Sequence, residues 1–494
     1  MSFIQDRRCV LALVGLLAAL PGTPASATEL KLGGYYRTRF TFTDNLFLAR
    51  DIEADPLEGD PGSDGAGFYF DHRLRLEPEI RVNDYMSAYL QVDVFDNRIW
   101  GSDPSQDAVS SLYTSSAGIS QTLDLPSEFG MNVAVKRAWA EVYTPFGRFK
   151  AGRSGLTSGM GMYFNDGNGW DSDYGDTVDR VQFLTRVGPV YLLAGYDQVY
   201  EGNTDRSNDG SAATLGLAYR SEVASGSLMG YFQTDKSYPV VPGSAIPSTE
   251  GGEAFFPDAE RNDMFITNID AWGKGALGPT QLEAEFIYRR GSGDMALLPT
   301  GASSPDQAVT LTGASINQFG LVSRLTMDKG PALYGLEFGM ASGDENPDDI
   351  RFTTFTFDRD YHTGLILFRQ PLPTGSSSHL ATGDTANGNV PTTGDALANA
   401  LYFKPAATLD IRQGLTADAA LLAAWTFTPN EQNNNQKLYG YEIDLGLTAE
   451  FWQNLTVRAR GAAFLPGAVF ADVDRGIAHN EPAFAGEVQA NMRF

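Results

Sequence analysis

The last ten residues, Ala485-Gly486-Glu487-Val488-Gln489-Ala490-Asn491-Met492-Arg493-Phe494, alternate between polar and apolar side chains. Successive side chains of a β-strand point to opposite faces, so this stretch has one apolar face and one polar face. The apolar face would hold Val488, Ala490, Met492 and Phe494, and the polar face Glu487, Gln489, Asn491 and Arg493. Such a strand suits a wall with lipid on one side and water on the other. A membrane-spanning sheet is therefore predicted, provided that the pattern recurs along the chain.

The amino terminus has the features of a secretory signal. Arg7 and Arg8 precede an apolar run, residues 10–20, and a small-residue cleavage site, Ala25-Ser26-Ala27. The apolar run is shorter than the ~20 residues that a spanning helix needs. We therefore expect residues 1–27 to be a signal peptide and residues 28–494 to form one β-barrel. Cys9, the single cysteine, would leave with the signal, so no disulfide or thiolate metal site is expected.

Composition excludes several classes of protein. The 494 residues include 61 Asp and Glu but only 36 Lys and Arg, a formal net charge of −25, which disfavours nucleic acid as a partner. Beyond the signal, no apolar stretch reaches the ~18 residues of a transmembrane helix. Neither a linker-like shift in composition nor an internal repeat of about 20–50 residues divides the chain. One large closed sheet explains these features better than several soluble domains, a propeller or a sandwich.

Alternation with a period of two recurs along the whole chain and predicts about eighteen strands, with sixteen as the alternative. The predicted strands are residues 30–42, 68–82, 85–96, 132–143, 147–153, 177–187, 189–198, 212–220, 226–234, 263–273, 280–290, 316–326, 332–341, 401–411, 414–428, 438–450, 455–465 and 482–494. Tight turns such as Asn83-Asp84 and Gly278-Pro279 alternate with long polar connections. This predicts an all-β, antiparallel up-and-down barrel with short periplasmic turns and long extracellular loops.

Charged residues share one parity in most of the predicted strands, and apolar residues share the other. A charge at the lipid midplane costs about 2–4 kcal/mol, so the charged parity should line a water-filled lumen. Ion pairs between adjacent strands would also stabilise the wall, and both roles are compatible. The predicted pore-lining residues are Arg37, Arg39, Asp71, Arg73, Arg75, Glu77, Asp93, Arg137, Glu141, Arg180, Glu283, Glu285, Arg324, Glu442, Asp444, Arg458 and Arg460.

Three segments, residues 136–153, 339–344 and 440–467, resemble the alginate-export family of bacterial outer-membrane channels and their porin relatives. They contain Lys136-Arg137-Ala138-Trp139-Ala140-Glu141-Val142 with Gly147-Arg148-Phe149-Lys150-Ala151-Gly152-Arg153, then Gly339-Met340-Ala341-Ser342-Gly343-Asp344, and finally Gly440-Tyr441-Glu442-Ile443-Asp444-Leu445 with Phe464-Leu465-Pro466-Gly467. The resemblance implies a monomeric barrel in the outer membrane, surrounded by lipid and lipopolysaccharide. Its implied cargo is a hydrophilic solute: an ion, a sugar, or an anionic oligo- or polysaccharide. Because acidic residues nearly balance the arginines here, only the channel class is carried over.

Residues 160–176 are unusually rich in aromatic and apolar side chains for an exposed connection. A segment folded into the lumen as a constriction would explain this composition, and the alternative is a surface loop packed on its own aromatics. The candidate constriction residues are Tyr163, Asp166, Trp170, Asp171 and Tyr174. No cofactor is expected. The spacing of Asp and Asn leaves a loop calcium ion as an alternative, although the distal Glu of a full calcium loop is missing.

The longest connection, residues 342–400, contains an aromatic-rich part, residues 352–368, that we expect to form a small hairpin or lid. Catalysis has little support, because the four histidines lie outside any recognisable catalytic motif. The pairing of Asp344 or Asp358 with His362 is the one catalytic arrangement to check. We therefore expect a passive diffusion channel and no enzyme. The alternative is a structural or adhesive barrel whose long acidic loops bind a partner.

Overall fold

The computed structural model describes residues 28–46, 48–49, 66–100, 133–200, 210–236, 262–297, 309–346, 349–370, 372–373, 392–393, 396–430, 435–471 and 479–494. The predicted signal peptide, residues 1–27, lies outside these ranges. A search of the same ranges for helices found none with the length and hydropathy that a membrane crossing requires.

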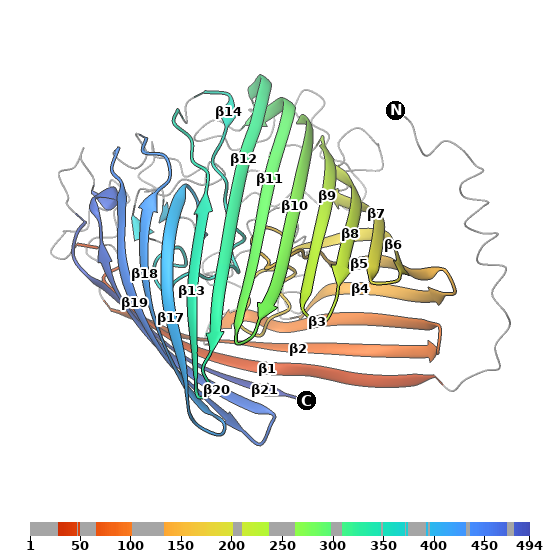
Figure 1. The fold of residues 1–494 in the computed structure, drawn as a ribbon, viewed down its shortest axis with the longest axis horizontal. Helices are drawn as coiled ribbons and strands as arrows, with labels where there is room; N and C mark the ends of the chain where they lie inside the picture. Colours follow the sequence, from red (N-terminus) through yellow and green to blue (C-terminus); the bar gives the residue numbers. More distant parts are fainter. Residues whose placement is uncertain are drawn as a thin grey trace.

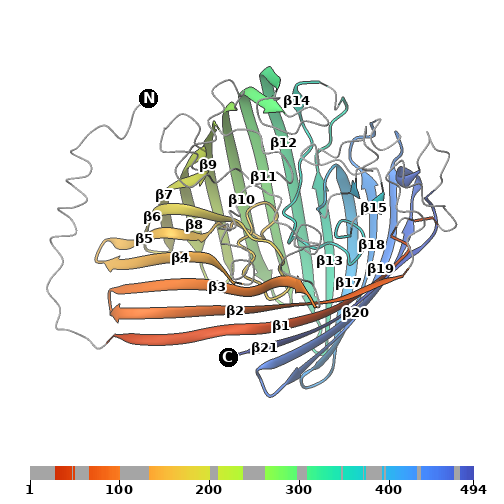
Figure 2. The same ribbon diagram turned by 180° about the vertical axis from the view of Figure 1, so that it is seen from behind.

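A closed antiparallel barrel of 18 strands forms the body of the molecule (Figures 1 and 2). Each barrel strand pairs with its neighbours in sequence, and the last strand pairs with the first, from Tyr35 with Arg493 to Asp44 with Phe484. The prediction of an all-β barrel is confirmed. The barrel strands are β1 (Glu29–Asp44), β2 (Gly67–Asn83), β3 (Met86–Ile99), β4 (Val133–Thr144), β5 (Gly147–Gly155), β6 (Thr177–Val187), β7 (Val190–Tyr200), β8 (Gly210–Arg220), β9 (Ala224–Asp235), β10 (Asp263–Leu277), β11 (Thr280–Leu297), β12 (Val309–Asp328), β13 (Ala332–Ala341), β17 (Ala400–Arg412), β18 (Leu415–Thr426), β19 (Leu438–Phe451), β20 (Leu455–Pro466) and β21 (Ala483–Arg493).

Short and long connections alternate around the ring. Asn83 pairs with Met86 across one tight turn, and Leu277 pairs with Thr280 across another. We call the end of the barrel with these turns the turn end and the opposite end the loop end. Short connections fit the periplasmic side of an outer-membrane barrel.

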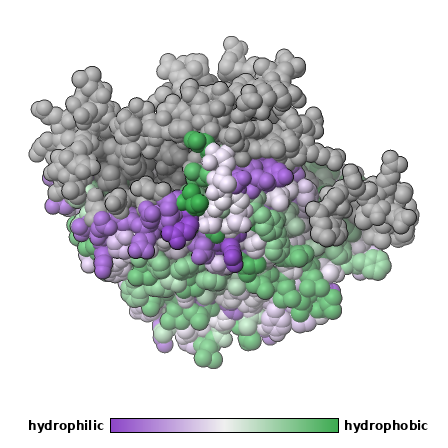
Figure 3. Space-filling view, turned by 90° about the horizontal axis from the view of Figure 1, so that it is seen from above, coloured by the Kyte–Doolittle hydropathy of each residue, from purple (hydrophilic) through white to green (hydrophobic). Residues whose placement is uncertain are grey.

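The two faces of the wall differ in chemistry. On β19, Tyr441, Ile443 and Leu445 are exposed, whereas Glu442, between Tyr441 and Ile443 in sequence, is fully buried. In a closed barrel, protein can cover side chains on the inner side of the wall but not on the outer side. The exposed side chains of each strand therefore point outward, and the buried ones, one residue apart from them, point inward. Figure 3 shows the resulting hydrophobic face, in green, beside a band of hydrophilic residues. A closed ladder with an apolar exterior is the arrangement of a bacterial outer-membrane β-barrel, and the chain lies in that membrane.

The hydrophobic core lies inside the barrel, towards the loop end. It joins inward-facing strand residues to two segments that leave the wall and enter the lumen: the first inward segment, residues 156–176, and the second inward segment, residues 349–370. Among its buried side chains are Leu156, Met162, Phe164, Val322, Phe355, Phe357, Leu365, Ile366, Leu367, Phe368, Tyr402, Leu422, Tyr439, Phe464, Val469 and Phe470.

Of the two alternatives for residues 352–368, a small hairpin or a lid, the hairpin does not form. Arg351–Phe352 (β14) pairs with β12 in parallel, and an isolated bridge joins Thr356 to Ala398. The rest of this stretch is irregular backbone packed into the core. The short strands β15 (Leu372–Pro373) and β16 (Thr392–Thr393) pair with each other. Residues 352–368 are therefore held in place by the burial of their aromatic side chains inside the barrel and not by strand pairing.

Candidate functional site

The first inward segment crosses the lumen. On β1, Arg37 donates hydrogen bonds to the carbonyls of Trp170 (3.1 Å) and Ser172 (3.3 Å). Across the ring on β11, Glu285 accepts hydrogen bonds from the backbone N–H groups of Met160 and Met162. Because β1 and β11 are far apart in the strand order, the segment must span the interior between them.

Buried arginines on β1 and β2 form an ion-pair network with this segment. Arg39 contacts Asp71 of the wall and Asp173 of the segment, each at 2.8 Å. Arg75 forms a bidentate ion pair with Asp93, in which both N···O distances are 2.7 Å. Paired charges of this kind tolerate burial, whereas removal of one partner leaves a costly unpaired charge. The network therefore fixes the segment against this side of the wall.

The tip of the first inward segment faces water. Asn168 and Gly169 are exposed, and Asp171 lies 2.5 Å from Arg458 and 3.2 Å from Arg460, both on β20. The Arg458 guanidinium also lies 4.6 Å from the centre of the Trp170 ring. Burial disfavours the Asp171 carboxylate, but Arg460, Arg369 and Arg458 outweigh that cost and hold its pKa below the ordinary value.

The two inward segments meet through acidic residues. Asp360 accepts hydrogen bonds from the backbone N–H groups of Asp173 (2.8 Å) and Tyr174 (3.2 Å). Burial and the nearby Asp173 carboxylate raise the pKa of Asp360 to about 6. Burial and the Asp360 carboxylate likewise raise the pKa of Asp176 to about 7, and the pKa of Asp358 is also raised, by burial and then by Asp176. The contact between the segments therefore favours protonated carboxyl groups.

The turn half of the lumen is open to water. The inward side chains of Lys274 and Arg324 are 41% and 43% exposed, whereas that of Arg37 in the loop half is fully buried. Arg324 pairs with Glu337 (2.6 Å), and Lys274 lies 3.6 Å from Glu283. Charged side chains thus continue from the inward segments to the turn end.

The predicted pore-lining residues all lie on the inward parity of their strands, but they differ in exposure. Most are buried: Arg37, Arg39, Asp71, Arg73, Arg75, Asp93, Arg137, Glu141, Arg180, Glu285 and Glu442. Glu283, Asp444, Arg458 and Arg460 are half-buried, and Glu77 and Arg324 are exposed. Their role in solute passage stays a prediction.

The candidate constriction residues lie within the lumen. Tyr163 packs on Phe355, and the Arg359 guanidinium lies 4.2 Å from the centre of the Tyr174 ring. The Asp166 carbonyl accepts a hydrogen bond from Arg137. Asp360 and Arg369 were not among the predicted site residues, because nothing in an irregular polar stretch marks which side chains will be buried. Gln489 and Asn491, on the polar face that alternation predicts for the last strand, are fully buried and could have been included.

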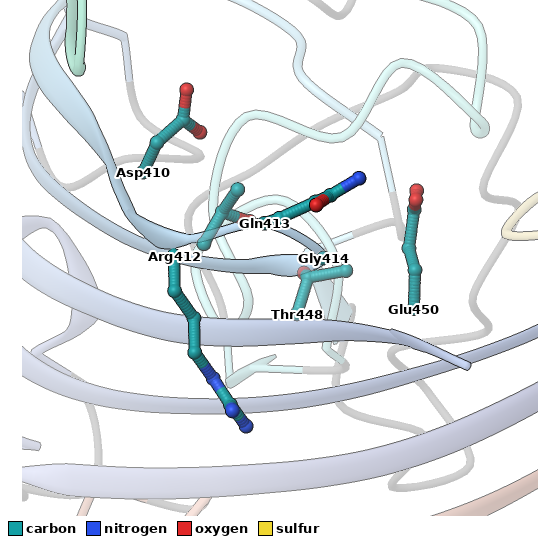
Figure 4. Close-up of a pocket in the computed structure, with 7 residues that line it drawn as sticks. Asp410, Arg412, Gln413, Gly414, Thr448 and Glu450 are labelled. Carbon is teal, nitrogen blue, oxygen red and sulfur yellow. The ribbon is translucent and has the colours of Figure 1, made fainter.

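A separate pocket of about 310 Å³ lies at the turn end, between β17, β18 and β19 (Figure 4). Asp410 and Glu450 point to one side of the strands there, and Arg412 points to the other (Figure 4). A register shift between Asp410 and Arg412 accounts for the reversal of Arg412. The pocket adds acidic side chains to the mouth of the lumen.

The catalytic and metal alternatives gain no support from the geometry. Nε2 of His362 lies 4.0 Å from Oδ1 of Asp360, and burial together with Arg369 lowers the pKa of His362 to about 3. Asp344 instead accepts hydrogen bonds from the backbone of Asn346 and Thr353. Within the described ranges, no group of three or more His, Cys, Asp or Glu side chains is placed to hold a metal ion. A loop calcium ion stays a prediction.

No protein-family model matches the chain, and no curated protein matches it. Among solved structures, it is similar to OpdQ of Pseudomonas aeruginosa, with 10% identity, a TM-score of 0.49, and coverage of 94% of this chain and 97% of that chain. OccK2 (OpdF) of the same organism has 11% identity, a TM-score of 0.49 and coverage of 94% and 98%. OmpT, an outer membrane protein of Vibrio cholerae, has 12% identity, a TM-score of 0.38 and coverage of 95% and 100%. These values support no family assignment, so the fold is taken from the strand pairing itself.

Proposed function

We propose that the protein is a porin-like channel through which small hydrophilic solutes diffuse passively across the outer membrane. The observation that carries this proposal is the charged inner wall, which is open to water in the turn half and lined by inward segments in the loop half. A polar lumen replaces part of a solute's hydration shell and can sort solutes by size and charge. The channel needs no covalent chemistry and no coupled energy source.

The charge distribution supports selection among polar solutes. Arginines concentrate on β20, β1, β2 and β4, whereas many of the acidic residues lie on the strands from β10 to β19. The half-buried members of the two groups are Arg458 and Arg460 on one side and Glu283 and Asp444 on the other, so a solute would meet charges of opposite sign there. The arginine side comprises Arg458, Arg460, Arg37, Arg39, Arg73, Arg75 and Arg137, and the acidic side includes Asp270, Glu283, Glu285, Glu337, Glu442 and Asp444. Ions, sugars and short uronates are the candidate solutes, and the protein would act as a monomer among lipid and lipopolysaccharide.

Planar-bilayer recording tests the proposal. The refolded barrel should give discrete conductance steps, and its reversal potential in a salt gradient should report the ion preference. Neutral oligosaccharides and uronates added as blockers would then separate the solute classes. A folded, inserted barrel that gives no conductance steps would contradict the channel and favour a partner-binding role for the loops.

A further inference from the structure

Residues 363–370, which we call the strap, lie against the inner faces of three alternate strands of the ring. The Lys404 ammonium on β17 donates to the Thr363 carbonyl (2.5 Å), and Arg369 donates to the Glu487 carboxylate on β21 (3.2 Å). Between these contacts, the strap backbone meets Glu442 on β19. Four consecutive apolar side chains of the strap are buried in the lumen core: Leu365, Ile366, Leu367 and Phe368.

Glu442 binds the strap through three consecutive backbone N–H groups. Its carboxylate accepts from Leu365 (2.6 Å), Ile366 (2.8 Å) and Leu367 (2.7 Å). The Glu442 side chain is fully buried. A buried carboxylate is costly unless it is hydrogen-bonded, and bonds to an ionised acceptor are stronger than neutral ones. One wall residue therefore satisfies three backbone donors and fixes the path of the strap.

Gly364 allows the strap to come this close. A Cβ atom built at Gly364 would lie 2.7 Å from Oε2 of Glu442 and 2.9 Å from its Cδ. Both distances are shorter than real Cβ contacts, so a larger residue would push the strap away from the carboxylate. The contact between Glu442 and the strap can therefore be weakened in two separate ways, by a substitution in the wall at Glu442 or by one in the strap at Gly364.

Asp418 on the neighbouring strand β18 offers a comparison. It lies on the inward parity of its strand and is half-buried. Its carboxylate lies beside Gly446, where a Cβ atom would be 2.2 Å from Oδ2 of Asp418, four residues along β19 from Glu442 towards the turn end. Replacing Asp418 by Asn removes a charge from the inner wall and leaves Glu442 and its three bonds to the strap in place.

We propose that Glu442 is the positioning residue that seats the strap inside the lumen and thereby sets the largest solute that can pass. The inference about solute size rests on the proposed channel function. The seating of the strap does not, because it can be measured without any conductance.

The first measurement uses a cysteine reporter in the strap. Thr363 is 1% exposed, so Thr363→Cys, in a full chain that carries Cys9→Ser, should react slowly with a hydrophilic maleimide. Adding Glu442→Gln or Gly364→Ala should raise the labelling rate about tenfold or more, because several charge-assisted bonds weaken together. Asp418→Asn should leave the rate unchanged. Glu442→Asp, which keeps the charge, should restore part of the slow rate.

The second measurement uses liposome swelling with neutral polymers of graded size. Glu442→Gln and Gly364→Ala should both admit larger polymers than the parent barrel, and Asp418→Asn should not. The heat-dependent shift in gel mobility shows which variants remain folded. If Glu442→Gln does not fold, Gly364→Ala carries the test alone.

Two results would overturn the inference: labelling that is unchanged in the folded variants, or labelling that rises equally in Asp418→Asn. If Glu442→Gln and Gly364→Ala speed up labelling but admit no larger polymers than the parent barrel, the strap does not set the largest solute that can pass. A parent barrel that is folded but impermeable would instead contradict the channel, and the labelling result would still stand.

Discussion

Arg37 and Arg39 on β1 and Arg137 on β4 each combine a positive charge with a bond to the first inward segment. Replacing all three by serine removes positive charge from the inner wall and leaves Asp71 and Asp173 without guanidinium partners. We expect the ion preference to shift towards cations, because the remaining carboxylates then dominate the local potential. The reversal potential across a bilayer in a salt gradient measures this shift.

Arg153→Ser is the control for this triple substitution. Arg153 pairs with Asp179 (2.7 Å) on the outward parity of β5 and β6, outside the lumen. Its removal should leave the reversal potential unchanged. An equal shift from the inner and outer substitutions would show that the strand faces are assigned wrongly.

Two adjacent glycines on β1 give a second prediction for single residues. Gly34 has a φ of +155°, and a Cβ there would lie 2.1 Å from the Arg75 carbonyl oxygen, whereas a Cβ at Gly33 would have its nearest neighbour at 3.8 Å. Gly34 also exchanges backbone hydrogen bonds with Phe494 (both 3.2 Å) near the barrel seam. Gly34→Ala should cost about 1–3 kcal/mol in stability, the usual cost of backbone strain. Urea unfolding followed by gel mobility should show a lower midpoint for Gly34→Ala than for Gly33→Ala.

Among the elements of the fold, the contact between the two inward segments should respond to pH. The pKa of Asp360 is raised to about 6 and that of Asp176 to about 7, so the docked state favours their protonated forms. Stabilisation from a raised pKa is complete below the ordinary value near 3.8 and is lost as the pH rises through the docked value. Docking should therefore be tighter at pH 5 than at pH 8. Other charged groups around this contact include Asp166, Asp173, Asp358, Arg73, Arg137 and Arg359.

Hydrogen exchange of residues 353–362, corrected for the intrinsic effect of pH on exchange, measures the docking. Protection should fall between pH 5 and pH 8 in the parent barrel. Asp360→Asn keeps a carbonyl acceptor for the N–H groups of Asp173 and Tyr174 but cannot ionise, so its profile should be flatter. Equal protection of the parent at both pH values would refute the prediction.

For the molecule as a whole, stability depends on which side of the wall carries charge. Leu445 is 59% exposed on the outward parity near the middle of β19, whereas Thr448 lies on the inward parity. Leu445→Arg should destabilise the inserted barrel by about 2–4 kcal/mol, the cost of an arginine near the bilayer midplane. Thr448→Arg should have little effect. Denaturant titration of folding into lipid vesicles compares the two, and a similar loss from both would contradict the lipid-facing assignment.

The wall of the barrel could be predicted from the amino-acid sequence alone. Each predicted strand is present, and strand β6 begins and ends at the predicted residues, Thr177 and Val187. Inward and outward parity could also be assigned, as with Glu442 between Tyr441 and Ile443. This works because side-chain alternation is a local property of a strand, and because lipid and water impose opposite demands on its two faces.

The segments that fill the lumen are visible only in the folded molecule. Residues 353–370 have no periodic pattern that distinguishes an exposed surface loop from a segment buried in the lumen. Their position depends on partners remote in sequence, such as Lys404, Glu442 and Glu487. The same holds for Asp173, whose guanidinium partners come from β1. Strand pairing follows from local alternation, whereas the burial of an irregular segment depends on backbone donors and carboxylates that meet only after the barrel has closed.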